Sequence, residues 1–252
     1  MMRLEARPPV AKLVLVPVVV VLFEVAVFTY LRTTHVESVI QNAIEDNLLA
    51  TSELYSALVR HLLIVGIAFS LTVVVGMPLA VLLFRSRGVV RVPVLALASL
   101  GQAVPSVGVL IYVSIWLGLG LGPTVLALVV YALLPVLRNT IVGLEGVDGA
   151  AVEAARGMGM TDLQTLLRVQ LPLASPVILA GLRTSLVLVV GTATLATFVG
   201  GGGLGDIISE GIGASPSIGP RIVLAGASMA AGLALLCDWL MSLVTLMVVP
   251  RT

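Results

Sequence analysis

Long apolar stretches, separated by short polar segments, run along most of the chain. About 20 apolar residues cross the hydrocarbon layer of a membrane as a helix. Several stretches reach that length, and the charged residues are concentrated between them. We therefore expect six membrane-spanning helices, at 12–31, 61–84, 97–118, 123–143, 176–199 and 222–249.

The third of these stretches is the least regular. Pro93 and Pro105 interrupt it, and the Gln-Ala-Val-Pro-Ser segment at 102–106 is too polar to face lipid. Broken helices are tolerated at membrane depth where they are buried in protein or line a cavity. We therefore expect irregular structure within 92–118.

The composition agrees with a helical membrane protein. Hydrophobic residues occupy 59% of the 252 positions and charged residues 11%, whereas soluble domains are roughly half apolar and about a quarter charged. No stretch alternates polar and apolar residues with period two, so a transmembrane β-barrel is not expected. The expected fold class is an all-α integral membrane protein with about six transmembrane helices.

Basic residues are divided unevenly between the two sides of the expected membrane. Cytoplasmic segments of membrane proteins carry an excess of Lys and Arg. That rule places both termini in the cytoplasm and puts the acidic stretch and the glycine-rich segment at 200–205 outside. The inner set is Arg3, Arg7, Lys12, Arg85, Arg87, Arg91, Arg138, Arg156, Arg168 and Arg251, the outer set is Arg32, Arg60 and Arg221, and the acidic stretch holds Glu37, Glu45, Asp46 and Glu53.

Few residue types that bind metals or nucleotides are present. Cys237 is the single cysteine, which excludes an internal disulfide and a cysteine metal cluster. His35 and His61 are the only histidines. Lys12 is the only lysine, so the chain has no Walker-type lysine to hold ATP phosphates.

A glycine pattern follows the fifth expected span. Gly200, Gly202 and Gly205 satisfy Gly-x-Gly-x-x-Gly, which indicates a dinucleotide site when it follows a strand. Here it follows a membrane helix. We therefore interpret it as a turn that needs positive φ or close backbone approach.

The longest polar interruption on the inner side is 144–175. Asp148 can cap a helix over 150–158, and Gly159 would end that helix as the residue after its C-cap. These local signals predict one short helix.

A second short helix is expected in the same interruption. Thr161 and Gln164 have the spacing of a capping box, and the helix would run to about Gln170. Pro172 is expected to stop it, and Ser175-Pro176 to begin the next span.

The spacing of residues in this interruption resembles a known motif. Glu-Ala-Ala at 153–155 is followed by three residues, Gly159, nine residues, Val169, one residue and Leu-Pro at 171–172. This is similar to the EAA motif of binding-protein-dependent ABC importer permeases, with Val in place of the usual Ile. In that family the loop docks on the ATPase subunit. The resemblance assigns ATPase coupling to Glu153, Ala154, Ala155, Gly159, Leu171 and Pro172.

Further segments resemble the osmoprotectant branch of that family, which imports glycine betaine, choline or carnitine. They are 102–106, 131–140 and 191–206. A permease for an amino acid such as methionine stays an alternative, because methionine permeases share the Gly-Gly-Leu-Gly-Asp element. The resemblance covers roughly 55–250.

The domain organisation follows from that coverage. Residues 1–55 are expected to form an N-terminal transmembrane helix and an external segment. Residues 56–252 are expected to form the permease domain, with the coupling loop at 144–172.

The resemblance also implies partners. They are an ATP-binding ABC subunit dimer, an extracytoplasmic substrate-binding protein, and a second permease copy or paralogue, in the lipid of a bacterial cytoplasmic membrane. The chain would bind no nucleic acid and no cofactor of its own, since ATP and Mg would be held by the ATPase. Transport would proceed by alternating access.

Polar residues within the expected spans are candidates for the translocation pathway. Each could instead make a helix–helix hydrogen bond. Tyr112, Trp116 and Tyr131 are better interpreted as interface anchors than as an aromatic cage. The pathway candidates are Gln102, Ser106, Asn139, Thr140, Thr192, Thr194 and Thr197.

Two charged residues fall inside the fifth and sixth expected spans. At about 1.5 Å per residue, the backbones of Arg183 and Asp238 differ by ~6 Å in depth, which an arginine side chain can cover. We therefore expect an intramembrane ion pair between them.

A secondary transporter, coupled to an ion gradient, is the main rival from another functional class. It would need intramembrane carboxylates as ion sites, for which Glu24 and Asp238 are the only candidates. No inverted repeat is visible. An intramembrane enzyme is not indicated, because no nucleophile–base pair or metal cluster is present.

Overall fold

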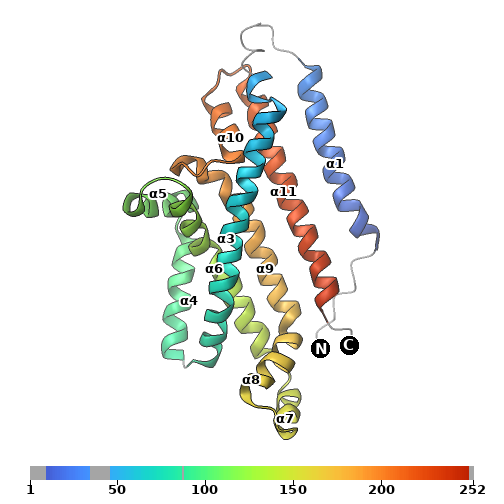
Figure 1. The fold of residues 1–252 in the computed structure, drawn as a ribbon, viewed down its shortest axis with the longest axis vertical. Helices are drawn as coiled ribbons and strands as arrows, with labels where there is room; N and C mark the ends of the chain where they lie inside the picture. The colour runs from blue at the N-terminus through green and yellow to red at the C-terminus, as the bar shows by residue number, and fades with distance from the viewer. Residues whose placement is uncertain (1–9, 35–45, 87, 250–252) are drawn as a thin grey trace.

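The computed structural model describes residues 10–34, 46–86 and 88–249 (Figure 1). Within these ranges the regular elements are all helices, as the sequence predicts. Some residues discussed above lie outside the described residues, namely Arg3, Arg7, His35, Glu37, Glu45, Arg87 and Arg251.

The helices follow one another through short connections. The α-helices are α1 (Val10–Thr33), α3 (Thr51–Arg85), α4 (Gly88–Ala103), α5 (Ser106–Leu117), α6 (Leu121–Glu145), α7 (Gly149–Gly157), α8 (Asp162–Thr165), α9 (Leu171–Ala193), α10 (Leu204–Gly213) and α11 (Gly219–Val248). A π-helical turn (Leu166–Gln170) joins α8 to α9, and a 3₁₀ turn (Thr194–Val199) extends α9.

Five helical segments are long and apolar enough to cross a membrane. They are α1, α3, α6, α11 and the run of helical turns from Asp162 to Val199. The pair α4 and α5 brings the number up to six if it counts as one span. This agrees with the expected number of spans.

The third expected span is not one straight helix. The chain breaks at Val104-Pro105, and α4 and α5 are bent by 104° relative to each other. Proline disfavours a helical conformation at the residue before it, which explains the position of the break. The expectation of irregular structure within 92–118 is thereby confirmed, and the stretch expected as a span at 97–118 is occupied by two helices, which cover 88–103 and 106–117.

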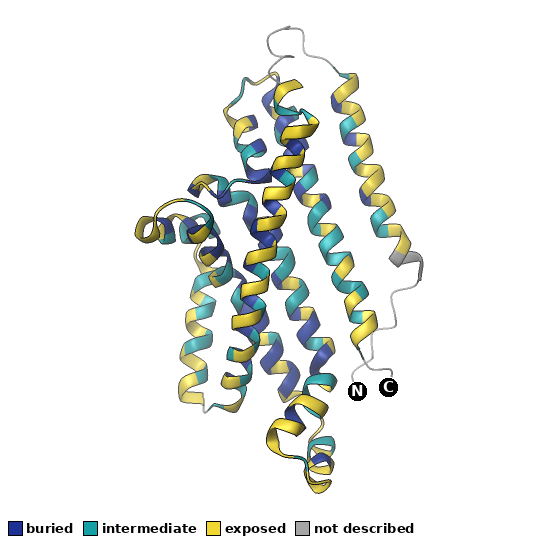
Figure 2. Cartoon of the chain, viewed as in Figure 1, coloured by how far each residue is buried: buried dark blue, intermediate teal, exposed yellow. Residues whose placement is uncertain are grey.

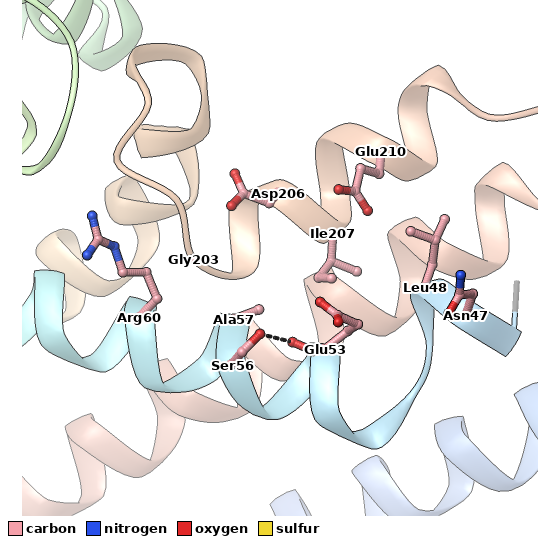
Figure 3. Close-up of a pocket in the computed structure, with 10 residues that line it drawn as sticks. All are labelled: Asn47, Leu48, Glu53, Ser56, Ala57, Arg60, Gly203, Asp206, Ile207 and Glu210. Atoms are coloured by element: carbon pink, nitrogen blue, oxygen red, sulfur yellow. Dashed lines mark hydrogen bonds between the residues drawn. The ribbon is translucent and has the colours of Figure 1, made fainter. Parts of the chain in front are cut away.

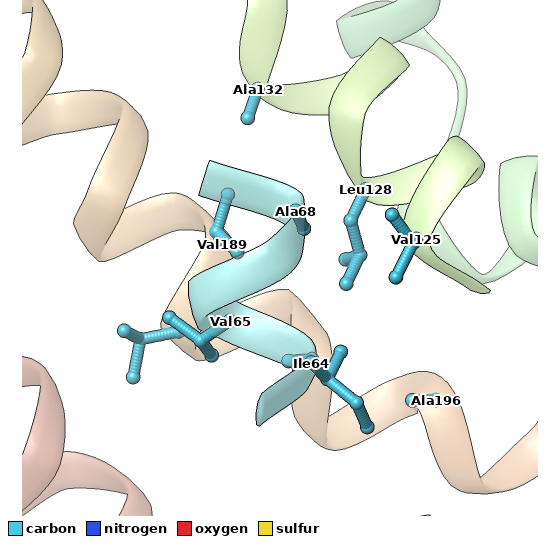
Figure 4. Packing of buried hydrophobic residues seen from close by; sticks show 10 residues of the cluster. Ile64, Val65, Ala68, Val125, Leu128, Ala132, Val189 and Ala196 are labelled. Atoms are coloured by element: carbon cyan, nitrogen blue, oxygen red, sulfur yellow. The ribbon is translucent and has the colours of Figure 1, made fainter. Parts of the chain in front are cut away.

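The core lies between α3, α6 and α9. Buried residues from all three helices meet there, including Ile64 on α3, Leu128 on α6 and Val189 on α9 (Figure 4). On α9, Gly181 lies so close to α6 that a Cβ there would be 2.7 Å from the carbonyl oxygen of Pro135. Small residues of this kind let membrane helices approach closely.

The outer faces of the bundle are apolar and exposed (Figure 2). In a membrane protein such surfaces face lipid or another subunit rather than water. Helix α1 is the most peripheral span and packs on α11. There Glu24 accepts a hydrogen bond from the Ser228 hydroxyl at 3.1 Å, beside Gly232.

The bundle has two dissimilar ends, which we name for what they carry (Figure 1). The loop end carries α7 and α8. The glycine end carries the segment 200–203 and α10. The described start of α1 and the described end of α11 both lie toward the loop end.

Candidate functional site

The first candidate region is the loop end, where the chain leaves the bundle to form α7. The Asp148 carboxylate caps α7 by accepting a hydrogen bond from the backbone N–H of Ala150 at 3.0 Å. The helix ends at Gly157 with Met158 as its C-cap, and Gly159, whose φ is +83°, is the next residue. The backbone N–H of Gly159 donates to the carbonyl of Arg156, and that of Met160 to Ala155. These two bonds form a Schellman motif, so the predicted first helix and its glycine stop are confirmed.

The predicted second helix starts as expected. The Thr161 hydroxyl accepts from the Gln164 backbone N–H at 3.3 Å, and the Gln164 side chain accepts from the Thr161 N–H at 2.9 Å. This is the capping box that the spacing predicts.

The predicted end of that helix is wrong. Pro172 does not stop it, and Asp162 to Val199 form one run of helical turns. The backbone N–H of Leu171 bonds to the carbonyl of Leu166, five residues earlier, so the chain passes through a π-turn just before the proline. Pro172 then falls in the first turn of α9, where its missing N–H costs little. The loop and the fifth span are therefore joined without a flexible connection.

The side chains of the residues expected to couple to an ATPase divide between the interior and the surface of the loop. Ala155 is buried and fixes α7 to the rest of the loop. Glu153, Ala154 and Gly159 are exposed, and Leu171 and Pro172 are half-buried.

Three apolar side chains are exposed on the loop, and the sequence analysis did not single them out. Met158 is 72% exposed, Leu163 58% and Leu167 54%. They are exposed at the end of the bundle that carries the polar loop, so a partner protein is a better occupant than lipid. The caps and the motif do not predict this exposure, although three apolar residues in a polar loop are themselves a sign of a contact surface.

Polar contacts lie within this loop and where it meets the bundle. Arg156 pairs with the Asp162 carboxylate at 3.3 Å, and Arg85 at the end of α3 donates to the carbonyl oxygen of Asp162 at 3.3 Å. Nearby, Arg91 on α4 forms an ion pair with Glu145 at the end of α6. The Arg85 bond thus joins the loop to α3, and the Arg91 pair joins the neighbouring ends of α4 and α6.

The pathway candidates do not gather at one place. Gln102 and Ser106 flank the break between α4 and α5, Asn139 and Thr140 lie on α6, and the three threonines lie at the glycine end of α9. Most of them make hydrogen bonds within the protein. The acceptors are Tyr131 O for Gln102, Pro135 O for Asn139, Met77 Sδ for Thr140, Leu188 O for Thr192 and Gly191 O for Thr194. Thr197 is half-buried.

Arg183 and Asp238 lie in contact between α9 and α11. The guanidinium meets the carboxylate through two nitrogens and two oxygens. Such a bidentate arrangement is the strong form of this pair. Both side chains remain partly exposed, at 44% and 33%, so the pair lies near the outer surface of the bundle.

The second candidate region is the glycine end. Gly200, Gly202 and Gly203 have φ values of +72°, +83° and +100°. A Cβ on Gly205 would lie 1.9 Å from the carbonyl oxygen of Thr194. The interpretation of this motif as a turn with positive φ and close backbone approach is therefore confirmed.

A cavity of about 430 Å³ opens beside this turn, between α3 and α10 (Figure 3). Glu53, Asp206 and Glu210 line it, and so does Arg60, whose Nε donates to the carbonyl oxygen of Gly201 at 2.9 Å. Partial burial, with Asp206 and Glu53 nearby, raises the pKa of the Glu210 carboxyl. The cavity is polar and predominantly acidic.

Among the described residues no group of three or more His, Cys, Asp or Glu is arranged to hold a metal ion.

The sequence matches the family described as "Binding-protein-dependent transport system inner membrane component" over residues 72–247. The carnitine transport permease OpuCD of Listeria monocytogenes is 40% identical over 182 residues, covering 72% of this chain and 80% of the relative. The glycine betaine/carnitine/choline transport system permease OpuCD of Bacillus subtilis is 41% identical over 184 residues, covering 72% and 78%. The osmoprotectant import permease OsmW of Salmonella typhimurium is 38% identical over 197 residues, covering 76% and 90%.

Solved structures share the fold at lower identity. An inward-facing MetNI methionine ABC transporter matches with a TM-score of 0.69 and 23% identity, covering 78% of this chain and 96% of that one. An amino acid ABC transporter solved with histidines matches with a TM-score of 0.63 and 19% identity, covering 84% and 100%. These likenesses concern the fold alone.

Proposed function

Because this chain belongs to the family of inner-membrane components of binding-protein-dependent transport systems, we propose that it is the permease subunit of an ABC importer for quaternary-amine osmoprotectants such as glycine betaine, choline or carnitine. It is a multi-pass membrane protein and a transport component rather than an enzyme. The substrate class is the part of this statement that needs a test.

The observation that carries the substrate class is the similarity to permeases of that branch. Relatives named for carnitine, choline or glycine betaine transport are about 40% identical over more than 70% of this chain. Methionine is the second candidate, and it rests on structures that are 23% identical. At that identity a common fold is compatible with a different solute.

The loop end supports a role in coupling to an ATPase. Capped α7 presents Glu153 and Ala154 together with the exposed Met158. A helix end that offers apolar side chains beside a carboxylate suits a groove on a folded partner. Because helical structure is continuous from Asp162 to Val199, a displacement of the loop is transmitted into the membrane core. In this proposal the loop end is cytoplasmic and the glycine end is external.

The remaining partners follow from the same proposal. An ATPase dimer holds ATP and Mg, a substrate-binding protein delivers the solute to the glycine end, and a second permease copy or paralogue completes the pathway. The half-buried polar residues, with Asn139 and Thr192 among them, give the solute weak contacts. Weak contacts suit alternating access, because a ligand moves such an equilibrium only through its differential affinity for the two states.

The test is uptake by the reconstituted complex. Proteoliposomes that contain the permease, its ATPase and its binding protein are loaded with ATP, and uptake of labelled glycine betaine, choline, carnitine and methionine is compared. We expect ATP-dependent uptake of one or more quaternary amines. Uptake of methionine alone would overturn the substrate class. Uptake by the permease alone under a proton or sodium gradient would overturn the transport mechanism.

A further inference from the structure

A fully buried histidine lies on α3 near the glycine end. His61 has no exposed surface. Its Nε2 lies 3.1 Å from the carbonyl oxygen of Val190 on α9. A carbonyl oxygen only accepts hydrogen bonds, so Nε2 must carry the proton and donate. The other ring nitrogen, Nδ1, has no hydrogen-bond partner among the described residues.

The Val190 carbonyl is available because α9 changes its hydrogen-bond pattern at this point. In a continuing α-helix the backbone N–H of Thr194 would bond to Val190 O. Here that N–H bonds to Gly191 O instead, and the chain continues as a 3₁₀ turn. A buried carbonyl without a donor is costly. His61 supplies the missing donor from a neighbouring helix.

The opposite side of the ring faces the start of α10. A Cβ on Gly203 would lie 3.2 Å from both Nδ1 and the Cβ of His61, and Gly203 has positive φ. The imidazole thus fills the space between the end of α9, where the 3₁₀ turn begins, and the turn that leads into α10. We call His61, the Val190 carbonyl and Gly203 the latch.

The latch and the coupling loop lie at opposite ends of one run of helical turns. That run starts at Asp162, beside α7, and ends at Val199, just beyond the latch. A movement of the loop that displaces this end of α9 relative to α3 would therefore break the bond from His61 to Val190.

We propose that His61 is a positioning residue for transport, which holds the glycine end of α9 on α3 until the loaded binding protein and ATP drive the helices apart. This rests on the proposed function. His61 acts through the backbone of α9 and contacts no solute in this role. The latch favours the resting arrangement, so that ATP hydrolysis stays low until the binding protein docks.

The experiment compares ATP hydrolysis with and without the loaded binding protein, using the whole complex in nanodiscs. His61→Phe keeps a ring of similar size without a donor, and His61→Leu serves as a second donor-free variant. His61→Gln keeps an N–H donor. Ser185→Ala is the matched control. The buried Ser185 hydroxyl donates to the carbonyl of Ala132 on α6, before the point where α9 changes to a 3₁₀ turn.

We expect the donor-free variants to raise ATP hydrolysis in the absence of binding protein about fivefold to tenfold, the shift that losing one buried hydrogen bond gives. Glycine betaine transported per ATP should fall. His61→Gln should restore most of the dependence on binding protein. Ser185→Ala should lower thermal stability without changing the ratio of hydrolysis with and without binding protein.

Three outcomes would overturn the latch. The donor-free variants could keep the wild-type ratio, Gln could fail to restore it, or only Gln could assemble, which would make the donor a requirement of folding alone. Failure of the proposed function is distinguished by the wild type. If the wild type moves no quaternary amine yet its hydrolysis responds to binding protein, the substrate class fails and the latch is still decided by the hydrolysis ratio. If the wild type shows no such response, both fail.

Discussion

The two ends of the helical run from Asp162 to Val199 are stabilised in opposite ways. At the loop end the helix caps are local, since the Asp148 cap, the stop at Gly159 and the Thr161–Gln164 box each join residues a few positions apart, and Arg85 adds one bond from α3. At the glycine end they are long-range, since His61 reaches α9 and Arg60 reaches the glycine turn. The difference suits a loop that must present a surface to a partner and a turn that must stay packed.

This comparison predicts which substitutions lower stability and which change the response to a partner. Substitutions that overfill the glycine turn should lower the stability of the whole bundle. Changes at the loop end should leave the bundle folded and alter its response to the ATPase. Three glycine or cap substitutions test that division.

Gly205→Ala has the largest expected effect. The added methyl would lie 1.9 Å from the carbonyl oxygen of Thr194, so backbone must move. Overpacking of this kind costs about 3 kcal/mol, and we expect a strong fall in the folded yield measured by size-exclusion chromatography in detergent. The control is Gly213→Ala at the other end of α10, where a Cβ meets nothing within 4 Å. Equal folded yields for the two variants would contradict close packing at this end.

Gly159→Val is expected to have an intermediate effect that stays within the loop. A Cβ at this position meets nothing within 4 Å, so the strain comes only from the φ of +83°. A left-handed conformation costs a residue with Cβ roughly 1–2 kcal/mol. The folded yield should match the wild type, while uptake and binding-protein-stimulated ATP hydrolysis fall together. Gly157→Ala, at a helical position with open space around it, should behave as the wild type. Loss of the bundle in Gly159→Val would show that the loop is not separable from the core.

Asp148→Ala has the smallest expected effect. It removes the cap of α7, which is worth about 1 kcal/mol. We expect the affinity for the ATPase subunit, titrated onto the permease in nanodiscs, to fall about fivefold. Asp148→Asn should restore it, because Asn caps a helix about as well as Asp. A result in which Asn is no better than Ala would assign the effect to charge rather than to the cap.

The difference between local and long-range contacts also explains which features the sequence predicts correctly. The caps of α7 and α8 depend on residues a few positions apart, so their spacing was sufficient to place them. The depth of Arg183 and Asp238 followed from the fixed rise of a helix, and the structure places the two side chains in contact. Their role in folding or transport stays a prediction, as do the roles of the pathway residues.

Other features could not be derived from local patterns. The stop expected at Pro172 was wrong because a π-turn beside it changes the bonding register, and that turn has no simple sequence signal. The role of His61 depends on a carbonyl that is 129 positions away in the chain. The turn at 200–205 was expected to need glycine, but the groups that lie against it come from α3, from α6 and from the 3₁₀ turn Thr194–Val199.

The π-turn at Leu166–Gln170 has a consequence for how the motif spacing is read. A π-turn holds one residue more than an α-turn, and one residue corresponds to about 100° of rotation around a helix. A helical wheel drawn straight through the run is therefore out of phase on the two sides of this turn. The π-turn overlaps the nine residues between Gly159 and Val169. Deleting one residue at 166–168 would let this turn close as an α-turn. The helical segments on its two sides would then keep their relative orientation and the caps of α7 and α8 would stay intact, although the spacing of the motif would have changed.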